Sequence, residues 1–170
     1  DLLQTAIKSL TCMTHRGGVA ADGVTGDGCG LLMQKPDAFL RVIANEQFNT
    51  ELSESYGIGM VFFSRKAKKA DYARNILDQE IQAQGLEVVG WRNVPYDSSF
   101  CGRMALECMP DIEQVFVNAI GVDKEQLAVK LFIARRKAEN QLIDDLERCA
   151  EKLATGNNGK SRNWSHFVNF

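Results

Sequence analysis

The sequence lacks any long hydrophobic run and any large excess of one charge. None of its apolar stretches approaches the roughly 18 residues that a membrane-spanning helix needs, so we expect no membrane partner. Its 170 residues include 20 Lys and Arg against 22 Asp and Glu, a net charge of −2. This balance gives no electrostatic basis for binding nucleic acid. The first residues show no signal-peptide pattern, and we expect a cytoplasmic protein.

Paired cysteines are missing too. The five cysteines are an odd number, and no two of them stand in a Cys-x-x-Cys pair. This spacing argues against a disulfide framework and against a thiolate metal site, so we expect no metal. Buried free thiols in a reducing compartment are the expected state. A redox role for Cys101 and Cys108 is a weaker alternative that alkylation rates would test.

Glycine, by contrast, is concentrated in one place. Six of the 14 glycines fall within residues 15–30, which read HRGGVAADGVTGDGCG. Interior glycines cost a helix about 1 kcal/mol each, so we expect a shaped loop. Glycine there would supply positive φ and close backbone approach, and the Asp side chains would bond nearby amides. The nucleotide fingerprints G-x-G-x-x-G and G-K-[ST] are incomplete, and the spacing of the two Asp residues does not fit a calcium loop.

Apolar periodicity and turn residues predict alternating helices and strands. Residues 96–110 have no clear pattern. Two glycines within residues 56–63 predict that a helix or another backbone packs close to that strand. Helices are expected at residues 2–13 with one face buried, from Pro36, at 67–84 ending at Gly85, and from Asp123 to about 153; strands are expected at 30–34, 56–63, 86–94, 112–118 and from 164. This order predicts an α/β (α+β) fold in one domain spanning residues 1–170.

The string from His15 to Pro36 resembles the amino-terminal signature of the glutamine amidotransferase domain of the glutamate synthase large chain. The family pattern is His-Arg-Gly-Ala, two or three residues, Ala-Asp-Gly, one residue, Thr-Gly-Asp-Gly, a small residue, Gly, then apolar residues and Pro. Four later segments resemble the same family in the same order: residues 56–63, 89–95, 110–117 and 131–136. The resemblance covers residues 2 to about 145.

The resemblance implies a partial Ntn-hydrolase fold, the four-layer αββα sandwich of the class II amidotransferases. In that family an amino-terminal cysteine attacks the side-chain amide of glutamine, and its own α-amine can act as the base. The released ammonia converts 2-oxoglutarate to glutamate elsewhere in the enzyme. FMN and an iron–sulfur cluster carry electrons in the full-length enzyme, so we expect no cofactor in this chain. NADPH, through a small subunit, and ferredoxin both remain open as electron donors.

The resemblance also assigns site residues. Arg16 matches the family arginine beside the nucleophile, where a guanidinium lowers the pKa of a thiol and stabilises negative charge. His15, Gly17, Gly26, Asp27 and Gly28 match the loop that shapes the same region.

Several family features are missing from the sequence. It begins with Asp1 instead of the nucleophilic cysteine. The family segments Arg-x-Ser-Thr, which holds the glutamine carboxylate, and Asn-Gly, which supplies the oxyanion hole, are not found. We therefore expect a fragment that lacks the nucleophile strand and the carboxyl-terminal half of the domain. Such a fragment would be inactive alone and would bind glutamine only together with the remainder of the large chain.

The alternative is a stand-alone, non-catalytic binding or assembly module derived from the same fold. A coding region that continues in frame on both sides would favour the fragment, and flanking stop codons would favour the module.

Overall fold

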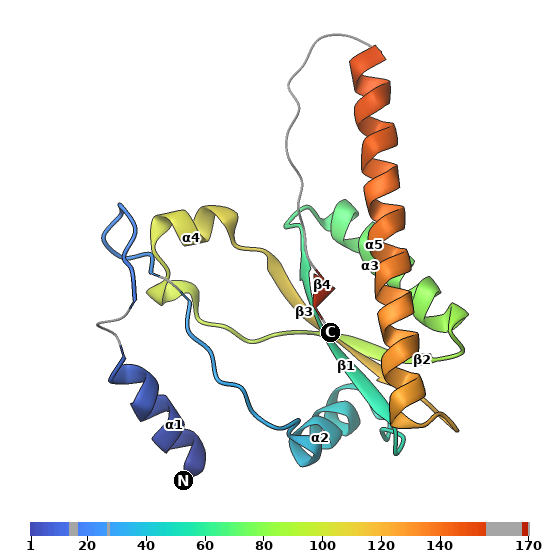
Figure 1. Cartoon of the computed structure of the whole chain (residues 1–170), viewed down its shortest axis with the longest axis horizontal. Helices are drawn as coiled ribbons and strands as arrows, with labels where there is room; N and C mark the ends of the chain where they lie inside the picture. Colours follow the sequence, from blue (N-terminus) through green and yellow to red (C-terminus); the bar gives the residue numbers. More distant parts are fainter. Residues whose placement is uncertain (14–16, 27, 156–167, 170) are drawn as a thin grey trace. The chain divides into compact units, whose positions relative to one another are not determined.

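The computed structural model describes residues 1–13, 17–26, 28–155 and 168–169. Its elements, labelled in Figure 1, are α1 (Leu2–Thr11), α2 (Asp37–Phe48), β1 (Tyr56–Phe63), α3 (Ala67–Ala83), β2 (Glu87–Asn93), the 3-10 helix η2 (Ser98–Phe100), α4 (Arg103–Cys108), β3 (Asp111–Asn118), α5 (Lys124–Thr155) and β4 (Val168–Asn169). The chain divides into two compact units. The first comprises Asp1–Ala38 and Pro95–Met109, and the second comprises Phe39–Val94 and Pro110–Phe170.

The second unit is built on a four-stranded sheet with the strand order β2-β3-β1-β4. All three strand pairings are antiparallel. β1 pairs with β3 along its whole length, from Tyr56 opposite Asn118 to Phe63 opposite Asp111. β2 has a register shift between Val88 and Gly90. The sheet confirms the three predicted strands at residues 56–63, 86–94 and 112–118 and the predicted mixture of helices and strands.

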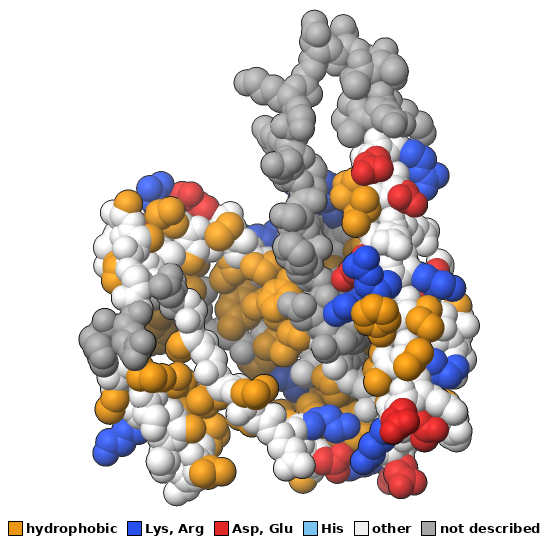
Figure 2. Space-filling model, in the orientation of Figure 1, with side chains coloured by type: hydrophobic (Ala, Val, Ile, Leu, Met, Phe, Trp, Pro, Cys, Tyr) orange, Lys and Arg blue, Asp and Glu red, His pale blue; other side chains and the backbone are white. Residues whose placement is uncertain are grey.

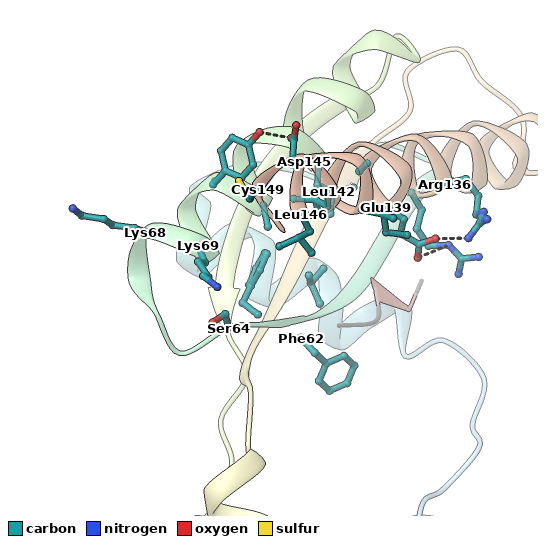
Figure 3. A pocket seen from close by; sticks show the side chains of 18 residues that line it. Phe62, Ser64, Lys68, Lys69, Arg136, Glu139, Leu142, Asp145, Leu146 and Cys149 are labelled. Carbon is teal, nitrogen blue, oxygen red and sulfur yellow. Dashed lines mark hydrogen bonds and ion pairs between the residues drawn. The ribbon is translucent and has the colours of Figure 1, made fainter. Parts of the chain in front are cut away.

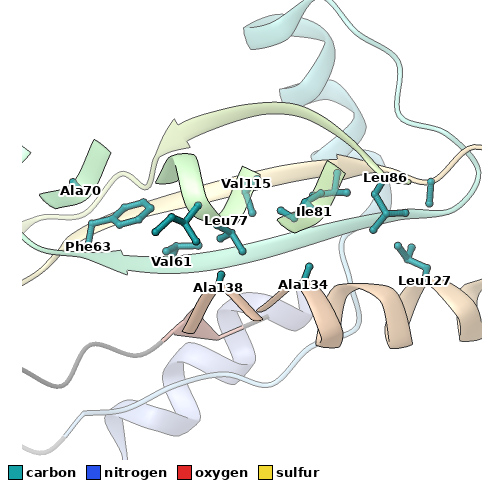
Figure 4. Packing of buried hydrophobic residues seen from close by; sticks show 13 residues of the cluster. Val61, Phe63, Ala70, Leu77, Ile81, Leu86, Val115, Leu127, Ala134 and Ala138 are labelled. Atoms are coloured by element: carbon teal, nitrogen blue, oxygen red, sulfur yellow. The ribbon is translucent and has the colours of Figure 1, made fainter. Parts of the chain in front are cut away.

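One face of this sheet packs against α3 and α5 (Figure 4). Every second residue of β1 and β3 points to these helices, as the two-residue period of a strand requires. The cluster consists of Val61, Phe63, Ala70, Ile76, Leu77, Ile81, Leu86, Val115, Val117, Ala119, Leu127, Ala134 and Ala138. A Cβ atom added to Gly57 would lie 2.5 Å from Cδ1 of Leu131 in α5. The prediction of close helix packing at a glycine of this strand is therefore confirmed at Gly57.

The opposite face carries a second, smaller cluster beneath α2. Its buried members are Leu40, Ala44, Leu52, Tyr56 and Phe116. The ring of Phe48, the last residue of α2, meets Phe116 edge to face at 5.4 Å between centroids. The same ring would lie 2.5 Å from a Cβ atom at Gly90, so that glycine lets α2 approach β2.

The helix boundaries follow local signals. α2 begins directly after Pro36, as predicted, because proline suits the first turn of a helix. α3 ends before Gly85, whose φ of +72° is the left-handed value expected of a glycine stop. Oδ1 of Asp123 accepts a hydrogen bond from the amide of Gln126 at 2.8 Å and caps α5 as predicted. Although α5 has 32 residues, neither it nor any other described helix is long and apolar enough to cross a membrane.

Three predictions from the sequence are wrong or fall outside the described residues. α1 forms, but none of its residues is buried. Residues 30–34 are not a strand, and Leu32 among them is fully exposed. A strand requires a hydrogen-bonded neighbour, and the described chain pairs none with this segment. Of the predicted strand from residue 164, only β4 is described; residues 164–167 and 170 lie outside the described residues.

An ion pair joins Arg74 of α3 to Glu113 of β3. Nε of Arg74 donates to Oε2 of Glu113 at 3.1 Å, and the two side chains are 24% and 12% exposed. The guanidinium also lies over the rings of Phe63 and Trp91, at 5.1 and 5.8 Å from their centroids. Hydrogen bonding to Glu113 raises the pKa of Arg74. The side chain of Arg74 therefore covers the edge of the larger cluster, while its guanidinium pairs with Glu113.

We expect Arg74→Ala to lower the free energy of unfolding by about 1–3 kcal/mol, because it leaves the mostly buried carboxylate of Glu113 without its partner. The matched control is Arg148→Ala, whose side chain is 65% exposed and pairs with Asp145 one turn away on α5. This control should change stability by about 0.5 kcal/mol or less. Urea denaturation followed by circular dichroism measures both, and equal losses would contradict the assignment.

Candidate functional site

Residues 19–26 of the glycine-rich string form a narrow hairpin in the first unit. Val19 and Gly26 form an antiparallel bridge at its base. The amide of Ala20 donates to the carbonyl of Thr25 at 2.6 Å. Gly23 has a φ of +71°, which confirms that a glycine supplies positive φ in this loop. The sequence from 19 to 26 is thus a closed turn with a defined shape.

The carboxylate of Asp22 lies at the centre of this hairpin. Its Oδ1 accepts hydrogen bonds from the amides of Val24 at 3.1 Å and Thr25 at 2.8 Å. Its Oδ2 accepts from Oγ1 of Thr25 at 2.5 Å and from the amide of Met104 at 3.2 Å. These bonds, above all that from the Thr25 hydroxyl, hold the pKa of Asp22 far below its ordinary value. The prediction that an Asp side chain bonds nearby amides is confirmed at Asp22.

A second segment of the first unit, residues 97–108, meets the hairpin at Gly102. A Cβ atom at Gly102 would lie 2.6 Å from both Oδ2 of Asp22 and the amide nitrogen of Thr25, and closer still to Oγ1 of Thr25. Only a glycine fits there without displacing one of the two segments. Sequence reasoning left this segment unassigned, because an isolated glycine before a six-residue helix carries no local signal for its partner.

The predicted site residues are only partly described. Gly17, Gly26 and Gly28 belong to the first unit. A Cβ atom at Gly26 would lie 3.3 Å from the carbonyl oxygen of Gly18, so this glycine permits close backbone approach as predicted, whereas open space surrounds Gly28. His15, Arg16 and Asp27 lie outside the described residues, and their roles stay predictions.

The thiols do not follow the expectation of burial. All five cysteines are free; Cys101 is partly buried and the other four are exposed. Sγ of Cys108 donates to the carbonyl of Met104 at 3.3 Å, within its own helix turn. The prediction of burial is wrong, because these four cysteines stand just after α1, after the hairpin, on α4 and on α5, at positions that no described element covers. Within the described ranges, no group of three or more His, Cys, Asp or Glu side chains could hold a metal ion.

A cavity of about 650 Å³ lies in the second unit between β1, α3 and α5 (Figure 3). Its walls are mainly apolar, and polar groups stand at its rim. The hydroxyl of Tyr72 donates to Asp145 at 2.5 Å, which raises the pKa of Tyr72, and Arg136 pairs with Glu139 at 2.7 Å. The described site residues Gly17, Gly26 and Gly28 are not among the residues that line it.

Apolar side chains are unusually exposed in the first unit, where Figure 2 shows them gathered on the surface. They include Leu2, Leu3, Ile7, Met13, Val19, Val24, Leu31, Leu32, Met33, Phe100, Met104 and Leu106. Exposed apolar side chains in this number are typical of a surface that packs against another polypeptide.

Known proteins match most of this chain, including the residues of the hairpin. The family profile described as "Glutamine amidotransferases class-II" matches residues 1–153. The chain is 39% identical over 142 residues to the "Glutamate synthase [NADPH] large chain" of Bacillus subtilis, covering 82% of this chain and 9% of that protein. It is 34% identical over 160 residues to "Ferredoxin-dependent glutamate synthase 2" of Synechocystis, covering 91% of this chain and 10% of the relative.

A third relative extends the match nearly to the end of the chain. "Ferredoxin-dependent glutamate synthase" of Pyropia yezoensis is 33% identical over 162 residues, which are 95% of this chain and 9% of that protein. The chain therefore spans about a tenth of the length of these curated relatives. The matched region contains both the hairpin around Asp22 and the sheet of the second unit. The chain belongs to the class II glutamine amidotransferases.

Proposed function

We propose that this chain is part of the glutaminase of a glutamate synthase, the portion that releases ammonia from glutamine. The observation that carries the proposal is the family match over residues 1–153, which includes a glycine-rich hairpin of defined shape directly after Arg16. Glutamate synthases are the relatives on which the identity of 33–39% rests. The proposed parent activity is that of these relatives.

The proposed chemistry is attack of a cysteine thiolate on the side-chain amide carbon of glutamine. The carbon–nitrogen bond breaks, ammonia leaves with a proton from the α-amine, and water then hydrolyses the thioester to glutamate. Arg16 would lower the pKa of the thiol and stabilise negative charge beside it. In the proposed parent enzyme the nucleophile is an amino-terminal cysteine of the complete domain, as the family resemblance implies.

The remaining parts of the parent activity would lie elsewhere in the large chain. We propose that the iron–sulfur cluster and the FMN of the parent enzyme bind elsewhere in the large chain, as the family resemblance implies. Conversion of 2-oxoglutarate to glutamate and contact with a small subunit or with ferredoxin belong to the same remainder. The exposed apolar side chains of the first unit supply a surface for packing against it. A cytoplasmic location fits five free thiols.

A chimera tests this proposal. In the Bacillus subtilis relative, the region that matches over 142 residues is replaced by the corresponding residues of this chain. We expect the chimera to release ammonia from glutamine and this chain alone to release none, because only the chimera has an amino-terminal cysteine. The chimera with that cysteine changed to alanine is the control and should be inactive. Equal turnover by this chain alone, or a folded chimera without glutaminase activity, would overturn the proposal.

A further inference from the structure

Of the four hydrogen bonds that Asp22 accepts, the one from the amide of Met104 joins two segments that are far apart in the sequence. The geometry points to Asp22 as a positioning residue of the glutamine site, which ties the hairpin after Arg16 to the first turn of α4 and so holds the hairpin in one place. This inference rests on the proposed function for its effect on activity. The tie itself involves only described residues of the first unit.

The two carboxylate oxygens of Asp22 accept hydrogen bonds from different parts of the chain. Oδ1 accepts only from the hairpin, since its two donors, the amides of Val24 and Thr25, lie within three residues of Asp22. Oδ2 reaches across 82 positions to the amide of Met104 and also accepts from the Thr25 hydroxyl. Only an ionised carboxylate can accept from all four donors, because an amide side chain has a single acceptor oxygen.

Gly102 supplies independent evidence that the two segments are fitted to each other. A methyl group there would meet Asp22 and Thr25 at distances that atoms do not adopt. The segments are therefore in direct contact at a position where one added carbon would part them. A hydrogen bond and a steric fit, which have different physical origins, mark the same junction.

The hairpin lies between the two charged residues that the resemblance assigns to the site. Arg16 precedes Val19 by three residues, and Asp27 follows Gly26 directly, while Val19 and Gly26 pair with each other. Both charged residues thus adjoin the base of the hairpin along the chain. An anchor at Asp22 restricts movement of this base, and catalytic geometry is sensitive to displacements of about 1 Å.

Hydrogen exchange on this chain tests the anchor without any activity. In Asp22→Asn one oxygen remains for four donors, and the local bonds to Val24 and Thr25 compete with the distant one. We expect the amide of Met104 to exchange about five to ten times faster than in the unchanged chain, the effect of losing one ordinary hydrogen bond. Asp97→Asn is the matched control, because Asp97 caps only its own turn through the amide of Ser99 at 2.9 Å. Its Met104 exchange should be unchanged.

The same measurement has a pH signature. The pKa of Asp22 is lower in the folded chain than its ordinary 3.8, so its contribution is present above that value. It is lost as the pH falls from 3.8 through the lower, folded pKa. Protection of the Met104 amide, corrected for intrinsic exchange, should therefore fall in that acidic range in the unchanged chain and stay flat in Asp22→Asn. A Met104 amide with equal protection in both proteins would overturn the inference.

The functional arm uses the chimera. We expect Asp22→Asn to lower kcat/KM for glutamine about tenfold and to move the acidic limb of its pH profile upward, because a displaced Arg16 no longer lowers the pKa of the thiol. Gly102→Ala should reproduce both changes, and Asp97→Asn neither. A lower melting temperature with an unchanged pH profile would reduce Asp22 to a structural role and refute the inference. An inactive but folded parent chimera would refute the proposed function, while the exchange data would still decide the anchor.

Discussion

Phe116→Ala is expected to lower the free energy of unfolding of the second unit by about 3–5 kcal/mol. Phe116 lies in β3, between β1 and β2, and is fully buried. Its ring fills the space between the sheet and α2 and meets Phe48 edge to face. Truncation would remove this contact and leave a cavity that the paired strands on either side cannot close. Urea denaturation followed by circular dichroism measures the loss.

Phe132→Ala is the control for this prediction. The ring of Phe132 on α5 is 57% exposed, and the guanidinium of Arg135 lies 5.5 Å from its centroid. Removing an exposed ring with one cation–π contact should cost no more than about 1 kcal/mol. If both truncations had the same effect, the cluster beneath α2 would not be the stabilising contact that its burial indicates.

Arg16→Ala in the chimera is expected to lower kcat/KM for glutamine on the order of 100-fold. Loss of the guanidinium would raise the pKa of the nucleophilic thiol and remove a charge that stabilises the oxyanion, and one such stabilising group is worth about 10²–10³ in rate. The acidic limb of the pH profile should move upward. Steady-state rates of ammonia release between about pH 5 and 9 would measure both kcat/KM and the acidic limb of its pH profile.

Two variants bracket the Arg16 prediction. Arg16→Lys keeps the charge without the planar fork and should recover part of the loss. Arg148→Ala removes an exposed arginine of α5 and should leave the kinetics unchanged. An Arg16→Ala chimera with wild-type kcat/KM and pH profile would show that the arginine of the motif does not serve the nucleophile.

Three strands, at 56–63, 86–94 and 112–118, could be predicted from the sequence. So could the helix at 67–84 and the helices that begin at Pro36 and Asp123. Their apolar periods, β-branched residues and capping residues act within a few positions of the chain. The left-handed glycines also follow this rule, since Gly23 and Gly85 stand in turns that their neighbours already indicate. The family string from His15 to Pro36 is likewise contiguous.

Two predictions that required a packing or pairing partner failed. Residues 30–34 have the composition of a strand, but strand formation depends on a neighbouring ladder that composition does not encode. The apolar side of α1 is likewise exposed, because burial depends on what packs there and not on the periodicity of the helix.

The local sequence determined which segments coil, extend or turn, because these preferences depend on residues a few positions apart. Only the tertiary structure decided that Asp22 meets Met104 across 82 positions and that Gly102 fits against Thr25. A carboxylate recruits donors that lie near it in space, and a glycine permits contact with whatever approaches it. The residues next to Asp22 and Gly102 in the sequence therefore do not indicate which distant residues these two contact.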